Sequence, residues 1–467
     1  MQGGSPLDTT SEPFSKASGG DARIQQLHLV HAADAKDVGL AFIDGPELVI
    51  GRGPEGAKTF AVSDSRVSRN HATLCRHPTT GEVTVHDCGS RNGTFVDGGR
   101  VTEAPLVHGS VLRVGDAVFT FTDVTVTTEE ARSLAPETPA LRGKSLAMQR
   151  VRGEISLVGP RSLSVLVLGE TGVGKERVAE EIHRRSKRTG PFLAVNCAAI
   201  VPSLAETELF GHTVGAFTGA TQKSEGVFVA ADKGTLFLDE IAELPISLQP
   251  KLLRALATGE IRAVGKAEAR TVDVRLVAAT HGDLEGAVES GGFRADLFAR
   301  LAAWVLRVPP LRRRREDILD LARVFLARQR VDVGLSASAA EALVLFDWPR
   351  NVRELEQVLA AASIRAQDGV VRPEHLPEPV ARPVASRIAK ASSSPLESPL
   401  QAIVPPGIAP NAEGLRLALD KFHGNVAQVA SYFGKDRKQI YRWAEKLRVD
   451  LDATRGAHDP GEGEPGP

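Results

Sequence analysis

The chain has 467 residues and a formal net charge of −1. A single hydrophobic core rarely serves so long a chain, so we expect roughly two to four domains. The near-zero charge excludes a uniformly basic polyanion-binding protein, and any contact with nucleic acid must be local. Three widely spaced cysteines form no Cys-x-x-Cys pair, which argues against disulfides or zinc and for a reducing compartment. No apolar run approaches the ~18 residues of a membrane span, so a cytoplasmic protein is expected.

Short strands are expected in the N-terminal part of the chain. Residues 1–23 contain no apolar stretch of the kind found in signal peptides and are predicted to be a disordered tail. Apolar and polar residues then alternate over residues 24–124, with Gly, Asp and Asn between the runs, which predicts an all-β sandwich. Residues 125–140 are predicted to be a linker.

Three motifs fall at the ends of these predicted strands, on loops that could converge: Gly51-Arg52, Ser68-Arg-Asn-His71 and Ser90-Arg-Asn-Gly-Thr94. Their order resembles that of a forkhead-associated (FHA) domain, which captures phosphothreonine. A phosphate of about −1.5 to −2 charge needs an arginine and neutral donors. The alternative is a β domain in which the three motifs occur by chance. The phosphothreonine-binding residues implied by the resemblance are Arg52, Ser68, Arg69, Arg91 and Asn92.

Strand-like and helical segments alternate over residues 141–378, which predicts an α/β domain with a parallel sheet. Within it the apolar run Leu163–Leu168 precedes Gly-Glu-Thr-Gly-Val-Gly-Lys-Glu and a helix. This context is typical of a P-loop, in which backbone N–H groups and a lysine bind the phosphates of ATP. The predicted ATP-binding residues are Gly169, Glu170, Thr171, Gly172, Val173, Gly174, Lys175 and Glu176.

An acidic strand end follows about 65 residues later. Asp239 is suited to hold Mg²⁺ through water, and Glu240 to polarise the attacking water; the alternative is a solvated acidic strand end. Hydrolysis also needs positive charge at the γ-phosphate, for which Arg294, Arg300 and Arg353 are candidates. Taken singly, each arginine is more often a surface ion pair than a catalytic residue. An arginine that serves a neighbouring subunit's nucleotide would make the active form a ring.

Between these two motifs lies the hexapeptide Gly215, Ala216, Phe217, Thr218, Gly219, Ala220. The glycines loosen the backbone and the alanines bury little, so the segment suits a mobile loop that presents one ring and one hydroxyl to a partner. The alternative is an ordinary tight turn with a buried Phe.

Residues 141–378 resemble the AAA+ domain of sigma-54-dependent transcriptional activators, the bacterial enhancer-binding proteins. The strings GETGVGKE, GAFTGA, GTLFLDEI, FRADLFARL and WPRNVRELE carry the resemblance. It implies a hexameric ATPase with a C-terminal helical lid, whose GAFTGA loop contacts sigma-54 through Phe217 and Thr218. It also implies that Asn196 restrains Glu240, that Arg294 and Arg300 act in trans, and that Arg353 is the sensor arginine.

The same resemblance has three departures. The first sensor of these proteins often reads Ala-Thr-Asn, and this chain has His281 at the third position. Arg350 replaces a glycine, and Thr213-Val214 replaces charged residues before GAFTGA. Glu176, which lacks the usual hydroxyl for Mg²⁺, is the family's own residue there. None of these changes removes a catalytic group, so ATP hydrolysis with Mg²⁺ is still expected.

The C-terminal part changes texture twice. Residues 379–410 are rich in Pro, Ser and Ala and are predicted to be a flexible linker. Residues 411–451 read helix, turn, helix, with Val426, Val429 and Ala430 on one inward face and Ile440, Trp443 and Leu447 on the other, and residues 452–467 are predicted to be a disordered tail. The segment resembles a Fis-type helix-turn-helix; a plain helical hairpin is the alternative. Its expected DNA contacts are Arg437, Lys438, Gln439, Tyr441 and Arg442.

Together these features predict an activator that binds enhancer DNA, senses a phosphothreonine-containing partner such as a Ser/Thr kinase, and remodels the sigma-54 RNA polymerase closed complex with ATP. The alternative is a DNA-binding FHA adaptor with a vestigial ATPase. The intact Lys175, Asp239 and Glu240 argue against that alternative. The sequence leaves open the target promoters and whether the ring is a hexamer or a heptamer.

Overall fold

The computed structural model describes residues 22–32, 38–53, 59–216, 221–329 and 333–382. Toward the C-terminus it also describes 415–416, 418–419, 426, 429–430, 433, 435, 437–447 and 449. The chain divides into two compact units, Met1–Val384 and Ala385–Pro467. Within the described residues, no helix is long and apolar enough to cross a membrane.

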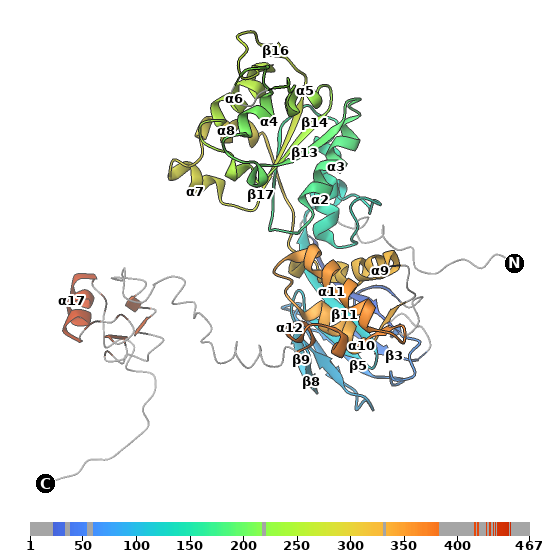
Figure 1. Ribbon diagram of the computed structural model, residues 1–467. Coiled ribbons are helices and arrows are strands. Elements are labelled where there is room, and N and C mark those ends of the chain that lie inside the picture. Colours follow the sequence, from blue (N-terminus) through green and yellow to red (C-terminus); the bar gives the residue numbers. More distant parts are fainter. Residues whose placement is uncertain are drawn as a thin grey trace. The chain divides into compact units, whose positions relative to one another are not determined.

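The N-terminal part is a β-sandwich, as predicted from the alternating pattern (Figure 1). One sheet has the order β2-β1-β11-β10-β7-β8 and the other β4-β3-β5-β6-β9. Side chains that alternate along β1 and β11, among them Leu27, Leu29, Phe119 and Phe121, fill the space between the sheets. The strands are β1 (Ala22–His31), β2 (Gly39–Phe42), β3 (Glu47–Gly51), β4 (Thr59–Ala61), β5 (Ala72–Arg76), β6 (Val83–Asp87), β7 (Thr94–Val96), β8 (Gly99–Val101), β9 (Glu103–Leu106), β10 (Val111–Val114) and β11 (Ala117–Val126).

The next part is an α/β layer with a five-stranded parallel sheet of order β13-β14-β17-β12-β18. Its strands are β12 (Val165–Leu168), β13 (Phe192–Asn196), β14 (Thr235–Asp239), β17 (Arg275–Thr280) and β18 (Trp304–Arg307). Its helices are α1 (Thr128–Ser133), α2 (Leu146–Val158), α3 (Lys175–Ser186), α4 (Ala205–Phe210), α5 (Val227–Ala230), α6 (Gln249–Thr258), α7 (Leu284–Glu289) and α8 (Ala295–Leu301). A small hairpin, β15 (Glu260–Ile261) and β16 (Arg270–Thr271), lies outside this sheet.

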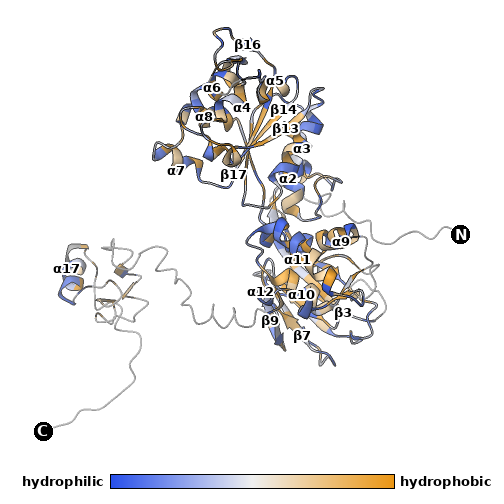
Figure 2. Ribbon diagram, in the orientation of Figure 1, coloured by the Kyte–Doolittle hydropathy of each residue, from blue (hydrophilic) through white to orange (hydrophobic). Residues whose placement is uncertain are grey.

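Both faces of the parallel sheet are buried, which explains why its strands are almost continuously apolar (Figure 2). Val165 and Val167 pack on one face in a cluster with residues of α2 and α3. Leu166, between them, packs on the opposite face in a cluster with residues of α4, α6 and α8. Successive side chains of a strand point to opposite faces, so one strand serves both clusters.

A helical lid follows, as expected. It contains α9 (Ile318–Arg328), α10 (Ala337–Leu345), α11 (Asn351–Arg365), α12 (Glu378–Ala381) and the short pair β19 (Gly334–Leu335) and β20 (Val370–Val371). Trp348 is fully buried in it and donates its indole N–H to Leu343 O at 2.8 Å. The lid core also includes Val111 of the sandwich, and Arg113 Nε donates to Glu341 Oε2 of α10 at 2.7 Å. Within the first unit, the sandwich and the lid therefore share one apolar interface with a partly buried ion pair.

The second unit contains α17 (Arg437–Leu447). Its core includes the predicted inward residues Val426, Val429, Ala430 and Ile440, with Trp443 and Leu447 packed against them. The two predicted inward faces are therefore confirmed.

Candidate functional site

The predicted P-loop joins the end of β12 to the start of α3. Gly174 caps α3 with a φ of +101°, a backbone conformation that glycine adopts without strain. Lys175 is only 7% exposed. Its Nζ donates to Gly169 O at 3.0 Å and to Glu240 Oε1 at 3.3 Å. A buried lysine with only these contacts, at the start of a helix that follows a glycine-rich loop, is suited to bind phosphate.

The lid packs directly against the loop. Gly172 has a φ of +78°, and a Cβ there would lie 2.2 Å from Arg350 O. Arg350 itself has a φ of −106°, so this position does not need the glycine that is usual in the family. Asn351 Nδ2 donates to Thr171 O and to Glu170 Oε2, both at 3.1 Å. Glu170 also accepts two hydrogen bonds from Arg312 at 2.7 and 2.5 Å, which keeps its pKa low.

Asp239 is the last residue of β14, and Glu240 follows it. In the sheet, β14 lies beside β17, and β17 lies beside β12, the strand that precedes the P-loop. Burial raises the pKa of Asp239. Burial also acts to raise the pKa of Glu240, but the hydrogen bond from His281 and the charge of Lys175 outweigh it, and the pKa is held below its usual value. The low pKa keeps Glu240 ionised at neutral pH.

Magnesium fits this site only with help from its substrate. Within the described residues, no three or more His, Cys, Asp or Glu side chains gather as a metal site. Mg²⁺ takes one or two carboxylates and completes its octahedron with phosphates and water. Asp239, half-buried with its Oδ1 accepting from Glu240 N at 3.1 Å, is the carboxylate that would hold it. When bound, the ion would neutralise charge on the phosphates.

The three predicted arginines lie in two places. Arg353 is on α11, where its N–H donates to Gly172 O at 3.4 Å, so it sits beside the P-loop. Arg294, the N-cap residue of α8, and Arg300, in its last turn, are exposed. Arg294 makes a two-point ion pair with Asp296, and Arg300 donates to Leu256 O at 3.1 Å. The structure brings only Arg353 to the loop of the same chain.

The stem of the GAFTGA segment is described, but Phe217–Ala220 lie outside the described residues. His212 and Ser224 form an antiparallel bridge, with His212 N donating to Ser224 O at 2.9 Å. Thr213 N donates to Val264 O at 3.0 Å. Gly215 has a φ of +79°. Backbone pairing with residues between β15 and β16 thus holds the stem, so Thr213 itself contributes little through its side chain beyond a 3.3 Å bond to Val264 O.

The FHA motifs meet at one edge of the sandwich. Gly51 allows this meeting, since a Cβ there would lie 1.9 Å from Arg69 O. Arg52 N donates to Ser68 O at 2.9 Å, and Arg91 N donates to Ser68 Oγ at 3.3 Å. All five predicted residues thus lie on three neighbouring loops, which follow β3, β4 and β6. The side chains of Arg52, Arg69 and Arg91 are exposed and form no ion pair within the described part of the chain.

His71 connects the loop that contains Ser68 to the loop that contains Gly93. Its Nδ1 accepts from Ser68 N at 3.0 Å, so its Nε2 is the nitrogen that donates to Gly93 O, at 3.1 Å. Burial lowers the pKa of His71, which favours the neutral ring that this arrangement needs. Asn92 Nδ2 donates to Arg66 O at 2.6 Å, so part of its side chain supports the neighbouring loop.

Sequence reasoning missed Asp87, which organises the loop that carries Arg91 and Asn92. Its Oδ1 accepts from Ser90 Oγ at 2.5 Å and from Thr94 Oγ1 at 2.6 Å, and its Oδ2 accepts from Ser90 N at 3.0 Å. An Asp directly before a Cys-Gly-Ser turn was the available signal, because Asp side chains bind backbone N–H groups in turns.

On α17 the predicted DNA contacts face away from the core. Arg437, Lys438, Tyr441 and Arg442 are exposed, whereas Ile440 and Ala444 are buried. Phe433 packs edge-on against Trp443, with ring centroids 5.7 Å apart. The helix therefore presents a basic face with one aromatic side chain.

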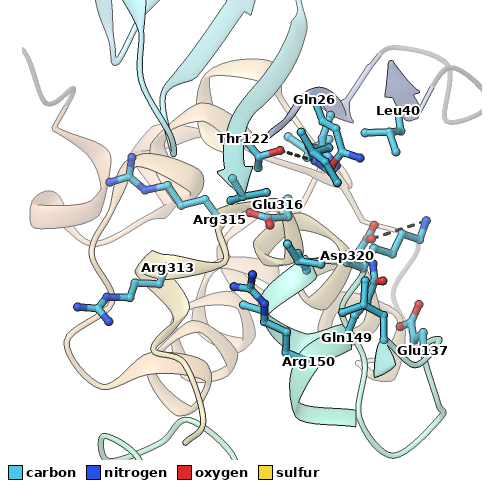
Figure 3. Close-up of a pocket in the computed structure, with 18 of the residues that line it drawn as sticks. Gln26, Leu40, Thr122, Glu137, Gln149, Arg150, Arg313, Arg315, Glu316 and Asp320 are labelled. Atoms are coloured by element: carbon cyan, nitrogen blue, oxygen red, sulfur yellow. Dashed lines mark hydrogen bonds and ion pairs between the residues drawn. The ribbon is translucent and has the colours of Figure 1, made fainter. Parts of the chain in front are cut away.

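A cavity of about 1100 Å³ lies among β1, β2, β11, α2 and the start of the lid (Figure 3). His28 Nε2 is 3.2 Å from Thr122 Oγ1, and Lys144 Nζ lies 3.9 Å from Asp320 Oδ2. Burial raises the pKa of Glu316 to about 8. Charged side chains of both signs line this cavity, so it gives no clear preference for a ligand.

Comparison with known proteins agrees with this geometry. Family models match for the sigma-54 interaction domain at residues 141–307, the FHA domain at 48–115 and the AAA+ ATPase lid domain at 312–393. The transcriptional regulatory protein ZraR of Escherichia coli is 40% identical over 337 residues, 68% of this chain and 74% of that protein. The nitric oxide reductase transcription regulator NorR1 of Cupriavidus necator is 51% identical over 229 residues, 48% of this chain and 45% of that protein.

Among solved structures, NtrX from Brucella abortus matches with 30% identity and a TM-score of 0.49, covering 69% of this chain and 70% of that one. The chain spans about half the length of several curated relatives that it matches.

The P-loop, the acidic strand end and the lid define an AAA+ ATPase domain, which here follows an FHA domain. The chain belongs to the family of sigma-54-dependent transcriptional regulators.

Proposed function

We propose that this protein is a cytoplasmic transcriptional activator that hydrolyses ATP to remodel the closed complex of sigma-54 RNA polymerase. The observation that carries the proposal is the assembly of Lys175, Asp239 and Glu240 at one end of the parallel sheet, closed by the lid. Membership of the sigma-54 regulator family supports the choice of polymerase as the target.

In this proposal, the N-terminal FHA domain binds the signalling partner and the C-terminal helices select the DNA site. Arg52, Ser68 and Arg69 form a cationic edge with neutral donors, which suits a phosphothreonine-containing protein. The basic face of α17 suits the major groove of enhancer DNA, with Arg437 and Arg442 among the contacts. Both assignments belong to the proposal.

The active form is proposed to be a ring, taken here as a hexamer. Arg294 and Arg300 are exposed, and within the described residues they bond to Asp296 and to Leu256 O rather than to the P-loop of their own chain. An arginine that stabilises the γ-phosphate must reach a nucleotide, so these two would act on the neighbouring subunit. Residues Gly215–Ala220, with Phe217 and Thr218 at the tip, are proposed to contact sigma-54.

The proposal is tested by ATP hydrolysis measured over a range of protein concentrations. We expect the rate per chain to rise with concentration, because each site is completed by a neighbour. Absence of hydrolysis at every concentration would leave the DNA-binding FHA adaptor as the better description.

The output is tested with Phe217→Ala in a reconstituted sigma-54 transcription assay. Open complexes should be lost while much of the ATPase remains, since the residue lies outside the nucleotide site. Unimpaired transcription by this variant would disprove the sigma-54 contact.

A further inference from the structure

The carboxylate of Glu240 has no free oxygen. Oε1 accepts from Lys175 Nζ at 3.3 Å. Oε2 is 2.7 Å from His281 Nδ1, and it also accepts from His281 N at 3.3 Å and from Thr280 Oγ1 at 3.4 Å. Since a carboxylate oxygen can only accept, His281 Nδ1 must carry the proton in this bond. The shortest of these contacts is therefore the one with the imidazole of His281.

The backbone of Glu240 is fixed in an unusual conformation. Its φ of +52° and ψ of +51° lie in the left-handed region, which costs a residue with a side chain free energy. Such a conformation persists only where surrounding contacts determine it. The contacts with His281 and Thr280 are such constraints, because both residues come from the end of the neighbouring strand β17.

Asn196, which the family resemblance assigns to restraining Glu240, is used differently. It lies in register with Asp239 on the adjacent strands β13 and β14. Its Oδ1 accepts from Ala198 N at 2.9 Å and caps the 3₁₀ turn Cys197–Ala199. The side chain is thus engaged as a cap, a role that Asn fills well.

Nucleotide binding changes only one of the two sides of Glu240. The P-loop lysine pairs with β- and γ-phosphates, so Lys175 must leave Glu240 when ATP binds. His281 makes no such exchange, and it remains as the side chain that fixes Oε2. With Oε2 held by His281, the carboxylate cannot turn toward an attacking water until this contact opens.

The strand that carries His281 is also connected to the loop that senses phosphate. Gly169 N donates to Thr280 O at 3.3 Å, and Leu168 pairs with Thr280 in the β12–β17 register. A change in the P-loop backbone therefore reaches the residue next to His281 through one hydrogen bond.

We propose that His281 is the positioning residue that restrains Glu240, in place of Asn196, and that hydrolysis requires this contact to open. The inference rests on the proposed ATPase function. It names the residue that sets the basal rate of that reaction in this chain.

The kinetic test compares His281→Ala, His281→Asn and Asn196→Ala in the full-length protein. His281→Ala should raise the basal kcat roughly three- to tenfold, the size of one ordinary hydrogen bond, because solvent weakens this partly exposed contact, with KM for ATP unchanged. His281→Asn should restore the low rate, because its amide can donate to Oε2. His77→Ala, an exposed histidine of the sandwich, should leave kcat unchanged. An unchanged or lower kcat in His281→Ala, or a rise in Asn196→Ala instead, would overturn the inference.

A second measurement is independent of turnover. In ¹⁵N-histidine spectra of the nucleotide-free protein, Glu240→Gln should shift the Nδ1 resonance that disappears in His281→Asn, and Asn196→Ala should not shift it. A resonance unaffected by Glu240→Gln means that the contact does not form and refutes the inference. If Glu240→Gln shifts the resonance but the wild-type protein hydrolyses no ATP, the proposed function is refuted and the contact is still established.

Discussion

The nucleotide site and the FHA edge both have the chemistry to bind phosphate. The cations of the nucleotide site form ion pairs with carboxylates, whereas those of the FHA edge form none in the part of the chain that the structure describes. At the nucleotide site, Lys175 is buried against Glu240, and Arg312 is paired with Glu170. At the FHA edge, Arg52, Arg69 and Arg91 are exposed and form no ion pair within the described residues. Paired cations exchange one anionic partner for another when a ligand binds. Unpaired cations gain their anionic partner only when a ligand binds.

This difference has energetic consequences. Exchange of partners makes the nucleotide site depend on its neighbours, because a cation removed there leaves a carboxylate unpaired. An unpaired surface arginine can be removed with little effect on the fold. Function and stability should therefore separate at the FHA edge and stay linked at the nucleotide site.

The largest effect is expected from Lys175→Ala. It removes the buried cation whose Nζ donates to Gly169 O and Glu240 Oε1, and ATP hydrolysis should fall by on the order of 10²-fold or more. Phosphothreonine-peptide binding, measured by calorimetry on the same preparation, should not change. Loss of both activities would show that the two sites are one folding unit rather than two separate devices.

Arg52→Ala should lower affinity for a phosphothreonine peptide roughly 10- to 100-fold, the value of one or two hydrogen bonds to a charged group. ATP hydrolysis and the melting temperature should stay unchanged. Arg142→Ala, an exposed arginine outside the sandwich, is the matched control. Retained affinity in Arg52→Ala would refute the phosphothreonine assignment.

A matched pair of substitutions compares stability at the two sites. Arg312→Gln breaks a partly exposed pair and should cost about 1 kcal/mol, seen as a lower denaturation midpoint. Arg69→Gln removes an unpaired charge and should change stability by less than about 0.5 kcal/mol. Equal losses in thermal or urea unfolding would contradict the distinction between paired and unpaired cations.

The smallest effect concerns pH. Burial lowers the pKa of His71, and it lowers the pKa of His28 and His31 to about 4. A histidine whose pKa is lower in the folded state binds its proton more readily when unfolded, so folding stability is full above about pH 6.5 and falls below it. The melting temperature of the peptide-free protein should therefore drop between pH 6.5 and 4. His71→Gln should be less stable at neutral pH but show a shallower decline; an unchanged slope would exclude His71 as a contributor.

The sequence predicted the fold class because its signals are local. The Gly-rich loop between an apolar strand and a helix indicates a P-loop from consecutive residues, and alternating runs indicate the sandwich. The inward faces of the C-terminal helices, with Val426 and Ile440, were also correct because helical periodicity is read within one segment.

Tertiary structure decided which side chains act on which. Arg312 meets Glu170 across 142 positions, Asn351 meets the P-loop across 180, and His281 meets Glu240 across 41. None of these pairs has a spacing that local periodicity records. The sequence alone predicted the groups that handle phosphate. Their partners were determined by the pairing of strands within the sheet and by the packing of the lid, because contacts between distant segments depend on how whole elements fit together.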